Sequence, residues 1–139
     1  MPDAPGLSGR WLGRYDYDGM AMEPVSFEAY LTETSGRLGG RIFEPNTFRD
    51  DRGAALEARI DGQCSGDEVR FVKVYLGFDQ GDDPVYAGTV DAARKRIEGR
   101  WSFAGLPGVS GRFVMMRKPR AAAVREQLAV EGIEIGSPR

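Results

Sequence analysis

A short phrase recurs along this chain: a glycine, a polar residue, and then a large apolar residue. It reads Gly9-Arg10-Trp11 near the start and Gly99-Arg100-Trp101 near the end, with looser copies at Gly40-Arg41-Ile42 and Gly111-Arg112-Phe113. Residues two apart share one face of a β-strand, so each phrase puts its glycine and its large apolar residue on the same side of a sheet. Glycine inside a strand often marks a sharp bend. The phrase therefore predicts a sheet of many strands that bends as a closing barrel does.

Strand-like segments separated by turn signals cover residues 8–118. The predicted strands span residues 9–18, 24–33, 37–44, 55–62, 68–76, 85–91, 96–103 and 109–117. Short connections with no helix between them predict an antiparallel meander. An open sheet of this size would leave two unpaired edges, which closure removes. We therefore predict an all-β fold, an eight-stranded antiparallel up-and-down barrel, whose interior can hold side chains or one small ligand.

The pattern changes after Lys118, so we place a single barrel domain over residues 1–118. Pro119 suits the first turn of a helix, and the following residues up to Glu131 are rich in Ala, Arg, Glu, Gln and Leu. Gly132 would end such a helix. We expect a short C-terminal helix over residues 119–132, packed on or beside the barrel, and a flexible tail over residues 133–139.

The chain contains no histidine. This excludes Ser-His-Asp and Cys-His catalysis, haem held by a proximal histidine, and nearly all zinc sites. The acidic loop of Asp79, Asp82 and Asp83 lacks the alternating oxygen ligands of a calcium loop, so we expect a solvated turn there. Cys64 is the only cysteine, which excludes an intramolecular disulfide. We expect neither a cofactor nor a metal.

The charge of the chain gives no indication of a nucleic-acid or membrane partner. Its formal net charge is -2 and its pI is near 5.3. Basic patches, which nucleic acids and anionic membranes attract, are therefore not expected to dominate the surface. Residues 1–9 lack the apolar segment of a secretory signal, and no apolar run is long enough to span a bilayer. Together with the single cysteine, these features favour a cytoplasmic location.

Gly9-Arg10-Trp11 opens the first predicted strand, about eight strands follow as a meander, and Arg117 closes the last one. In these features the chain resembles the calycins, which are the lipocalin, fatty-acid-binding and avidin-like barrels. In those proteins the tryptophan of the Gly-X-Trp phrase typically packs across one barrel end against an arginine of the last strand. The resemblance implies that Trp11 and Arg117, or Arg112 in its place, form a structural pair. It carries expectations about fold more than about function.

Alternation along each strand assigns the side chains to faces. Trp11, Tyr15 and Tyr17 fall on the inner face of the first strand, and Glu44 ends the inner face of the third. The fifth strand is ambiguous, because Val69, Phe71, Lys73 and Tyr75 oppose Arg70, Val72, Val74 and Leu76, and both sets are largely apolar. An outward Lys73, solvated like most lysines, is the simpler expectation. An inward Lys73 needs a partner for its ammonium group, and Glu44 is the candidate.

A cavity lined by aromatic rings with a few polar groups is the usual site for a small ligand. The candidate ligand-binding residues are Tyr15, Tyr17, Glu44, Phe48, Lys73, Tyr75 and Trp101. Phe48 lies in a polar loop, where it either covers the barrel mouth as a lid or anchors the loop. Alternatively, the tyrosine rings form core and send only their hydroxyl groups to water.

Six arginines fall on the predicted outer faces of the strands. They are Arg10, Arg14, Arg37, Arg41, Arg100 and Arg112. We expect cross-strand ion pairs with acidic neighbours, and a phosphate-binding stripe is the alternative.

Three functions stay open at this point. The leading one is a small cytoplasmic barrel that binds an apolar or amphipathic molecule. The first alternative is a solid structural or interaction barrel that self-associates, as a homodimer for example, through the two-faced strands five, six and eight. The second is a histidine-free isomerase or lyase that uses Glu44, Lys73 or a tyrosine, although we expect a non-enzymatic protein.

Overall fold

Eight strands follow one another along the chain and pair with their neighbours in that same order. The computed structural model describes residues 6–50 and 53–118. Within them the strands are β1 (Gly9–Tyr15), β2 (Val25–Thr34), β3 (Arg37–Pro45), β4 (Ala55–Ser65), β5 (Glu68–Tyr75), β6 (Val85–Val90), β7 (Arg96–Phe103) and β8 (Leu106–Arg117). The predicted C-terminal helix and tail lie outside the described residues.

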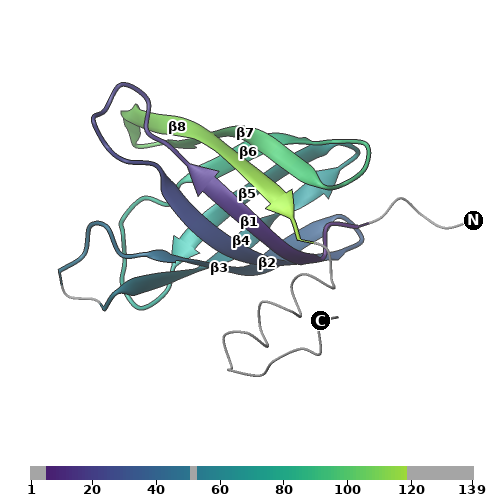
Figure 1. Ribbon diagram of the computed structural model, residues 1–139, viewed down its shortest axis with the longest axis horizontal. Helices are drawn as coiled ribbons and strands as arrows, with labels where there is room; N and C mark the ends of the chain where they lie inside the picture. The colour runs from purple at the N-terminus through teal and green to yellow at the C-terminus, as the bar shows by residue number, and fades with distance from the viewer. Residues whose placement is uncertain (1–5, 51–52, 119–139) are drawn as a thin grey trace, which may run out of the picture.

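The first and last strands close the barrel. β1 pairs antiparallel with β2 on one side and with β8 on the other, where Trp11 lies opposite Arg117 and Tyr15 opposite Phe113. Figure 1 shows β1 (purple) beside β8 (yellow-green), with the two arrows running in opposite directions. All other neighbours pair antiparallel as well. The predicted fold class, an all-β closed meander barrel of eight strands, is confirmed.

The start of β8 differs from the prediction. The last predicted strand spans residues 109–117, but β8 begins at Leu106, directly after a tight connection from Phe103. The register between β7 and β8 shifts at Ser102 and Phe103. Such a bulge leaves residues without a ladder partner, and Pro107, which has no N–H to donate, lies in that stretch.

Antiparallel order gives the barrel two chemically different ends. The C-terminal residues of β1, β3 and β5 meet at one end, which we call the tyrosine end after Tyr15 and Tyr75. The other end carries Trp11 near the start of β1 and Arg117 at the end of β8, and we call it the tryptophan end. Glu44, the penultimate residue of β3, lies at the tyrosine end.

Large side chains occupy the middle of the barrel. The rings of Phe71 and Tyr86 stack with centroids 4.9 Å apart, and Phe113 meets Tyr86 edge-on at 5.0 Å. Phe27 is also buried, and its ring lies where a Cβ at Gly13 would be. Burial of these rings, together with the aliphatic side chains of the core, is the main favourable contribution to the stability of such a fold.

The structure resolves the ambiguity of the fifth strand. Val69, Phe71, Lys73 and Tyr75 are buried, whereas Val72 and Val74 on the opposite face are half-exposed. The expectation of an outward, solvated Lys73 is therefore wrong. The Lys73 side chain faces inward because it shares a strand face with Phe71 and Tyr75, at i−2 and i+2. These two rings bury more apolar surface than the valines of the opposite face.

The recurring glycines allow close approach between strands as well as bending. Gly88 of β6 and Gly99 of β7 lie opposite each other. A Cβ at Gly99 would overlap the carbonyl oxygen of Ala87 and the Gly88 Cα. Only a residue without a side chain fits at this position of the ladder.

Candidate functional site

An ion pair lies inside the barrel near the tyrosine end. The Lys73 Nζ of β5 donates a hydrogen bond to the Glu44 Oε1 of β3, and both side chains are almost completely removed from water. Residues 44 and 73 belong to strands that are separated by β4, so the pair crosses the interior rather than a single ladder. Burying two charges is costly unless each finds its partner, and here each does.

Two tyrosines complete the coordination of the Glu44 carboxylate. The hydroxyl groups of Tyr15 and Tyr75 each donate to Glu44 Oε2, at 2.9 Å. The Lys73 ammonium lies 4.7 Å from the ring centroids of Tyr15 and Tyr75, and 5.8 Å from that of Tyr86. Lys73 is therefore stabilised by one carboxylate and three aromatic faces.

Burial shifts the ionisation of the three tyrosines and of Lys73 toward their neutral forms. Desolvation raises the pKa values of Tyr15, Tyr75 and Tyr86 above their usual 10.0, and the nearby Glu44 charge raises them further. Desolvation also lowers the pKa of Lys73 from its usual 10.5, and the attraction of Glu44 opposes part of that effect. Tyr15 and Tyr75 therefore act as hydrogen-bond donors to Glu44 at neutral pH.

A second layer of rings lies above this network toward solvent. Tyr17 meets Trp101 edge-on at 5.1 Å, and Tyr15 meets the same indole at 5.8 Å. Trp101 donates its Nε1–H to the Asp16 carbonyl oxygen at 2.9 Å, and Phe103 packs on it at 5.9 Å. Tyr17 and Phe103 are only partly buried, so this layer presents aromatic surface at the barrel end.

The loop after β3 brings Phe48 to the same end. Asn46 organises this loop, because its Oδ1 accepts the backbone N–H groups of Phe48 at 3.2 Å and Arg49 at 2.8 Å. The Phe48 ring meets Tyr75 at 5.5 Å and Phe78 at 6.3 Å while staying 43% exposed. Phe48 thus covers Tyr75 and still presents one side of its ring to water.

A hollow of about 360 Å³ opens beside the tyrosine end, between the loop that precedes β2 and the loop that follows β3. It is lined by Met22, Glu23, Pro24, Val25, Ser26, Pro45 and Thr47. Val25 pairs with Tyr15 in the β1–β2 ladder, and Pro45 follows Glu44 directly. We call this space the rim hollow. Its walls are mostly apolar, with one carboxyl group at Glu23.

The seven residues proposed from the sequence as a ligand site meet at one end of the barrel. Tyr15, Glu44, Lys73 and Tyr75 form the buried network, while Tyr17, Trp101 and Phe48 make ring contacts with its tyrosines. Sequence reasoning missed Tyr86, Phe78 and the rim hollow. Strand six has apolar residues on both faces, so alternation could not assign Tyr86 to the interior, and only the assembled barrel puts its ring beside Lys73.

The tryptophan end is built differently. The Arg117 guanidinium lies 4.9 Å from the Trp11 ring centroid and donates to the carbonyl oxygen of Gly6. Trp11 donates its Nε1–H to the Leu7 carbonyl oxygen at 2.9 Å, and both Trp11 and Leu7 are fully buried. The segment before β1 therefore closes this end of the barrel.

No protein-family model and no curated protein matches this chain. Within residues 6–50 and 53–118 we find no group of three acidic or cysteine side chains placed to hold a metal ion. No helix in those ranges has the length and apolar character needed to span a bilayer. The class that the fold defines is an eight-stranded antiparallel β-barrel, consistent with a calycin-like layout.

Proposed function

We propose that the protein binds a small apolar or amphipathic molecule at the tyrosine end of its barrel. The observation that carries this proposal is the coincidence there of partly exposed aromatic rings, namely Tyr17, Phe48 and Phe103, with the mostly apolar rim hollow. Pockets of this size with apolar walls and few polar groups are typical of small-ligand sites. The ligand would sit at the barrel end, since Phe27, Phe71 and Phe113 already fill the centre.

The walls of the rim hollow suggest the chemistry of the ligand. Met22 is flexible and adapts to irregular apolar shapes, while Val25 and Pro45 form firm walls. Glu23 and the Thr47 hydroxyl offer hydrogen bonds to one polar group. These features favour a mainly apolar molecule with a single neutral or cationic polar group. Glu44 and Lys73 lie beneath the rings, already paired with each other, and we assign them to support rather than to ligand contact.

Binding of a neutral fluorescent probe, N-phenyl-1-naphthylamine, tests the location. Met22 and Met116 are similarly exposed, at 42% and 46%, but only Met22 lines the rim hollow. We expect Met22→Asp to weaken probe binding by about tenfold or more, because it places a charge against an apolar ligand. The matched variant Met116→Asp should leave the Kd unchanged. Equal effects of the two variants, or no probe binding to the wild type, would refute the proposed site.

The natural ligand can be sought by native mass spectrometry of protein purified from its own host. A retained small molecule, lost in Met22→Asp but kept in Met116→Asp, would identify the ligand class. A ligand retained equally by both variants would place the site elsewhere.

A solid barrel that self-associates is the second candidate. It is favoured by the filled interior, and by an exposed ring pair outside it, because Tyr30 and Phe43 meet edge-on at 5.9 Å across β2 and β3. The sequence pointed instead to strands five, six and eight, which stays a prediction. Light scattering at micromolar concentration tests this candidate. A dimer that Phe43→Lys dissociates would support it, and a strict monomer would exclude it.

A further inference from the structure

A second hollow, of about 600 Å³, lies on the outside of the barrel over β1, β7 and β8. Its lining residues are Arg14, Asp16, Arg96, Glu98, Gly99, Arg100, Arg112, Phe113 and Val114. Four arginines and two carboxylates give this lining a formal charge of +2, by 4 − 2, although the whole chain carries -2. We call this space the arginine hollow. The positive charge of this lining is therefore local and opposite in sign to the net charge of the whole chain.

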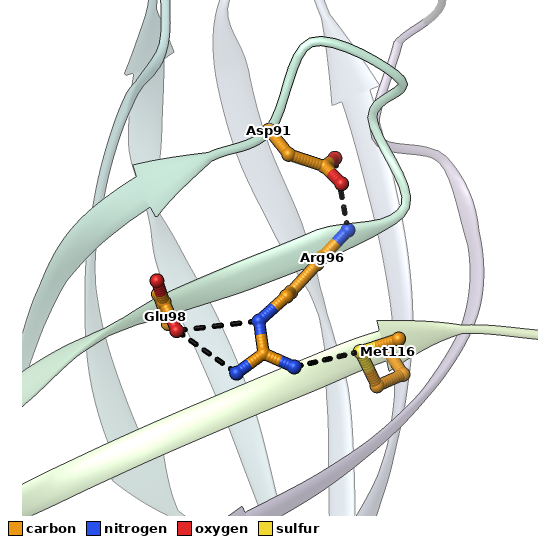
Figure 2. A network of polar contacts seen from close by, with 4 residues as sticks. All are labelled: Asp91, Arg96, Glu98 and Met116. Atoms are coloured by element: carbon orange, nitrogen blue, oxygen red, sulfur yellow. Dashed lines mark hydrogen bonds and ion pairs between the residues drawn. The ribbon is translucent and has the colours of Figure 1, made fainter.

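Two of the four arginines are already held by carboxylates. Arg100 pairs with Asp18 from the segment after β1. Arg96 donates to Glu98 Oε2 from Nη2 at 2.9 Å and from Nε at 3.2 Å, and its Nη1 lies 3.6 Å from the Met116 sulfur (Figure 2). The Asp91 carboxylate accepts the backbone N–H of Arg96, which fixes the start of β7. Arg96 is thereby oriented along one edge of the arginine hollow.

The other two arginines have no such partner. Within the part of the chain that the structure describes, the guanidinium groups of Arg14 and Arg112 make no hydrogen bond or ion pair. The nearby Asp16 uses its Oδ1 to accept the backbone N–H of Arg112 at 2.8 Å rather than to hold a guanidinium. Two free cations therefore face the arginine hollow from adjacent strands.

The strand register brings positively charged residues of neighbouring strands together at this point. Arg112 lies directly opposite Arg100 in the β7–β8 ladder, and Arg14 lies opposite Val114, two residues along β8 from Arg112. Like charges directly opposite each other destabilise a sheet. An anion placed between them removes that repulsion. The register therefore favours the binding of an anion at this position.

We propose that the arginine hollow binds a phosphate group, with Arg14 and Arg112 as its principal ligands and Arg100 as a third. A guanidinium group binds phosphate oxygens through paired, charge-assisted hydrogen bonds. The unpaired guanidinium groups of Arg14 and Arg112, on neighbouring strands, therefore suit a phosphate group. Val114, which lies opposite Arg14 and also lines the hollow, supplies apolar surface for the remainder of the ligand. The phosphate belongs either to a soluble compound or to a lipid headgroup, and both would present the same group to the arginines. This proposal is independent of a ligand at the tyrosine end.

Isothermal titration with inorganic phosphate tests the site, at fixed ionic strength. The double variant Arg14→Gln/Arg112→Gln removes the two free guanidinium groups. The matched variant Arg37→Gln/Arg70→Gln removes the same charge from β3 and β5, where both arginines flank a different hollow. We expect the first variant to weaken phosphate binding by about tenfold or more and the second by less than about twofold, since only the first removes charge-assisted bonds. Circular dichroism verifies that both variants keep the fold.

Two outcomes would overturn the proposal. One is an equal loss of affinity in both double variants, which would show attraction to general positive charge. The other is a wild-type protein that binds neither inorganic phosphate nor vesicles of phosphatidylglycerol. Sedimentation with phosphatidylglycerol vesicles, compared with phosphatidylcholine vesicles, distinguishes the sources. Binding to the anionic vesicles that is lost in Arg14→Gln/Arg112→Gln would indicate a lipid headgroup, and binding to free phosphate alone would indicate a soluble ligand.

Discussion

Lys73 and Glu44 form an ion pair inside the barrel, joining β5 to β3 across the intervening β4. Hydroxyl groups from Tyr15 and Tyr75 satisfy the second carboxylate oxygen, and tyrosine rings surround the ammonium group. A buried pair of this kind contributes little net stability compared with apolar side chains, but loss of one partner is costly. Its effect is to hold β1, β3 and β5 in one relative arrangement, since Tyr15, Glu44 and Lys73 come from these strands.

Removing one partner of this pair should strongly destabilise the fold. We expect Lys73→Met or Glu44→Gln to lower the free energy of unfolding by about 3–5 kcal/mol, because each leaves the other group buried without its counter-charge. The double variant should be more stable than the sum of the two losses predicts. Urea unfolding at 25 °C measures all three. Strict additivity would contradict direct coupling between the two side chains.

Alkaline conditions should unfold the protein cooperatively. The folded state raises the pKa values of Tyr15, Tyr75 and Tyr86 above 10.0, so above that pH the unfolded chain loses protons that the folded chain keeps. Stability then falls as pH rises, by about 1.4 kcal/mol per pH unit for each tyrosine and about 4 kcal/mol for the three together.

Lys73 acts with the opposite sign over a lower range. Its pKa is lowered on folding, so between that value and 10.5 the unfolded state binds the extra proton and stability rises with pH. Above 10.5 it is neutral in both states and leaves the tyrosine effect unopposed. A pH titration checks both effects, with absorbance at 295 nm following tyrosine ionisation and circular dichroism following unfolding. A major rise in tyrosinate absorbance should coincide with unfolding, and full ionisation of the tyrosines in a folded protein would be inconsistent with these burials.

The Gly88–Gly99 contact should tolerate no side chain. We expect Gly99→Ala to cost about 1–3 kcal/mol, because its Cβ would overlap the backbone of β6 and force the strands apart. Gly108→Ala in β8 is a matched control, since a Cβ there meets nothing within 4 Å. Urea unfolding of both variants provides the comparison. A Gly99→Ala variant as stable as Gly108→Ala would show that the strands can separate freely.

The pairing of Arg117 with Trp11 should contribute measurably at the tryptophan end. We expect Arg117→Met to lower the free energy of unfolding by about 1–2 kcal/mol, because a cation over a buried indole and a bond to the Gly6 carbonyl oxygen are both lost. Arg112→Met, which removes a guanidinium without a protein partner, should stay within about 0.5 kcal/mol of the wild type. Thermal unfolding under identical conditions gives both values.

Much of the architecture follows from local patterns in the sequence. Alternation within β1, β2 and β4 is clean, so the inward position of Trp11, Phe27 and Ile60 could be assigned residue by residue. The meeting of Tyr15, Glu44 and Tyr75 at one barrel end also follows from antiparallel order, because each lies at or near the C-terminal end of an odd-numbered strand. These inferences need only the period of a strand and its direction.

Other features depend on contacts between residues far apart in the chain, and only the tertiary structure decided them. Lys73 lies on a strand with two apolar faces, and the counter-charge for its buried ammonium group comes from Glu44, which is 29 residues away. The arginine hollow requires β1 to pair with β8, which brings Arg14 beside Val114 and Arg112. Alternation specifies which residues share a strand face, but barrel closure and register determine which charges from different strands become neighbours.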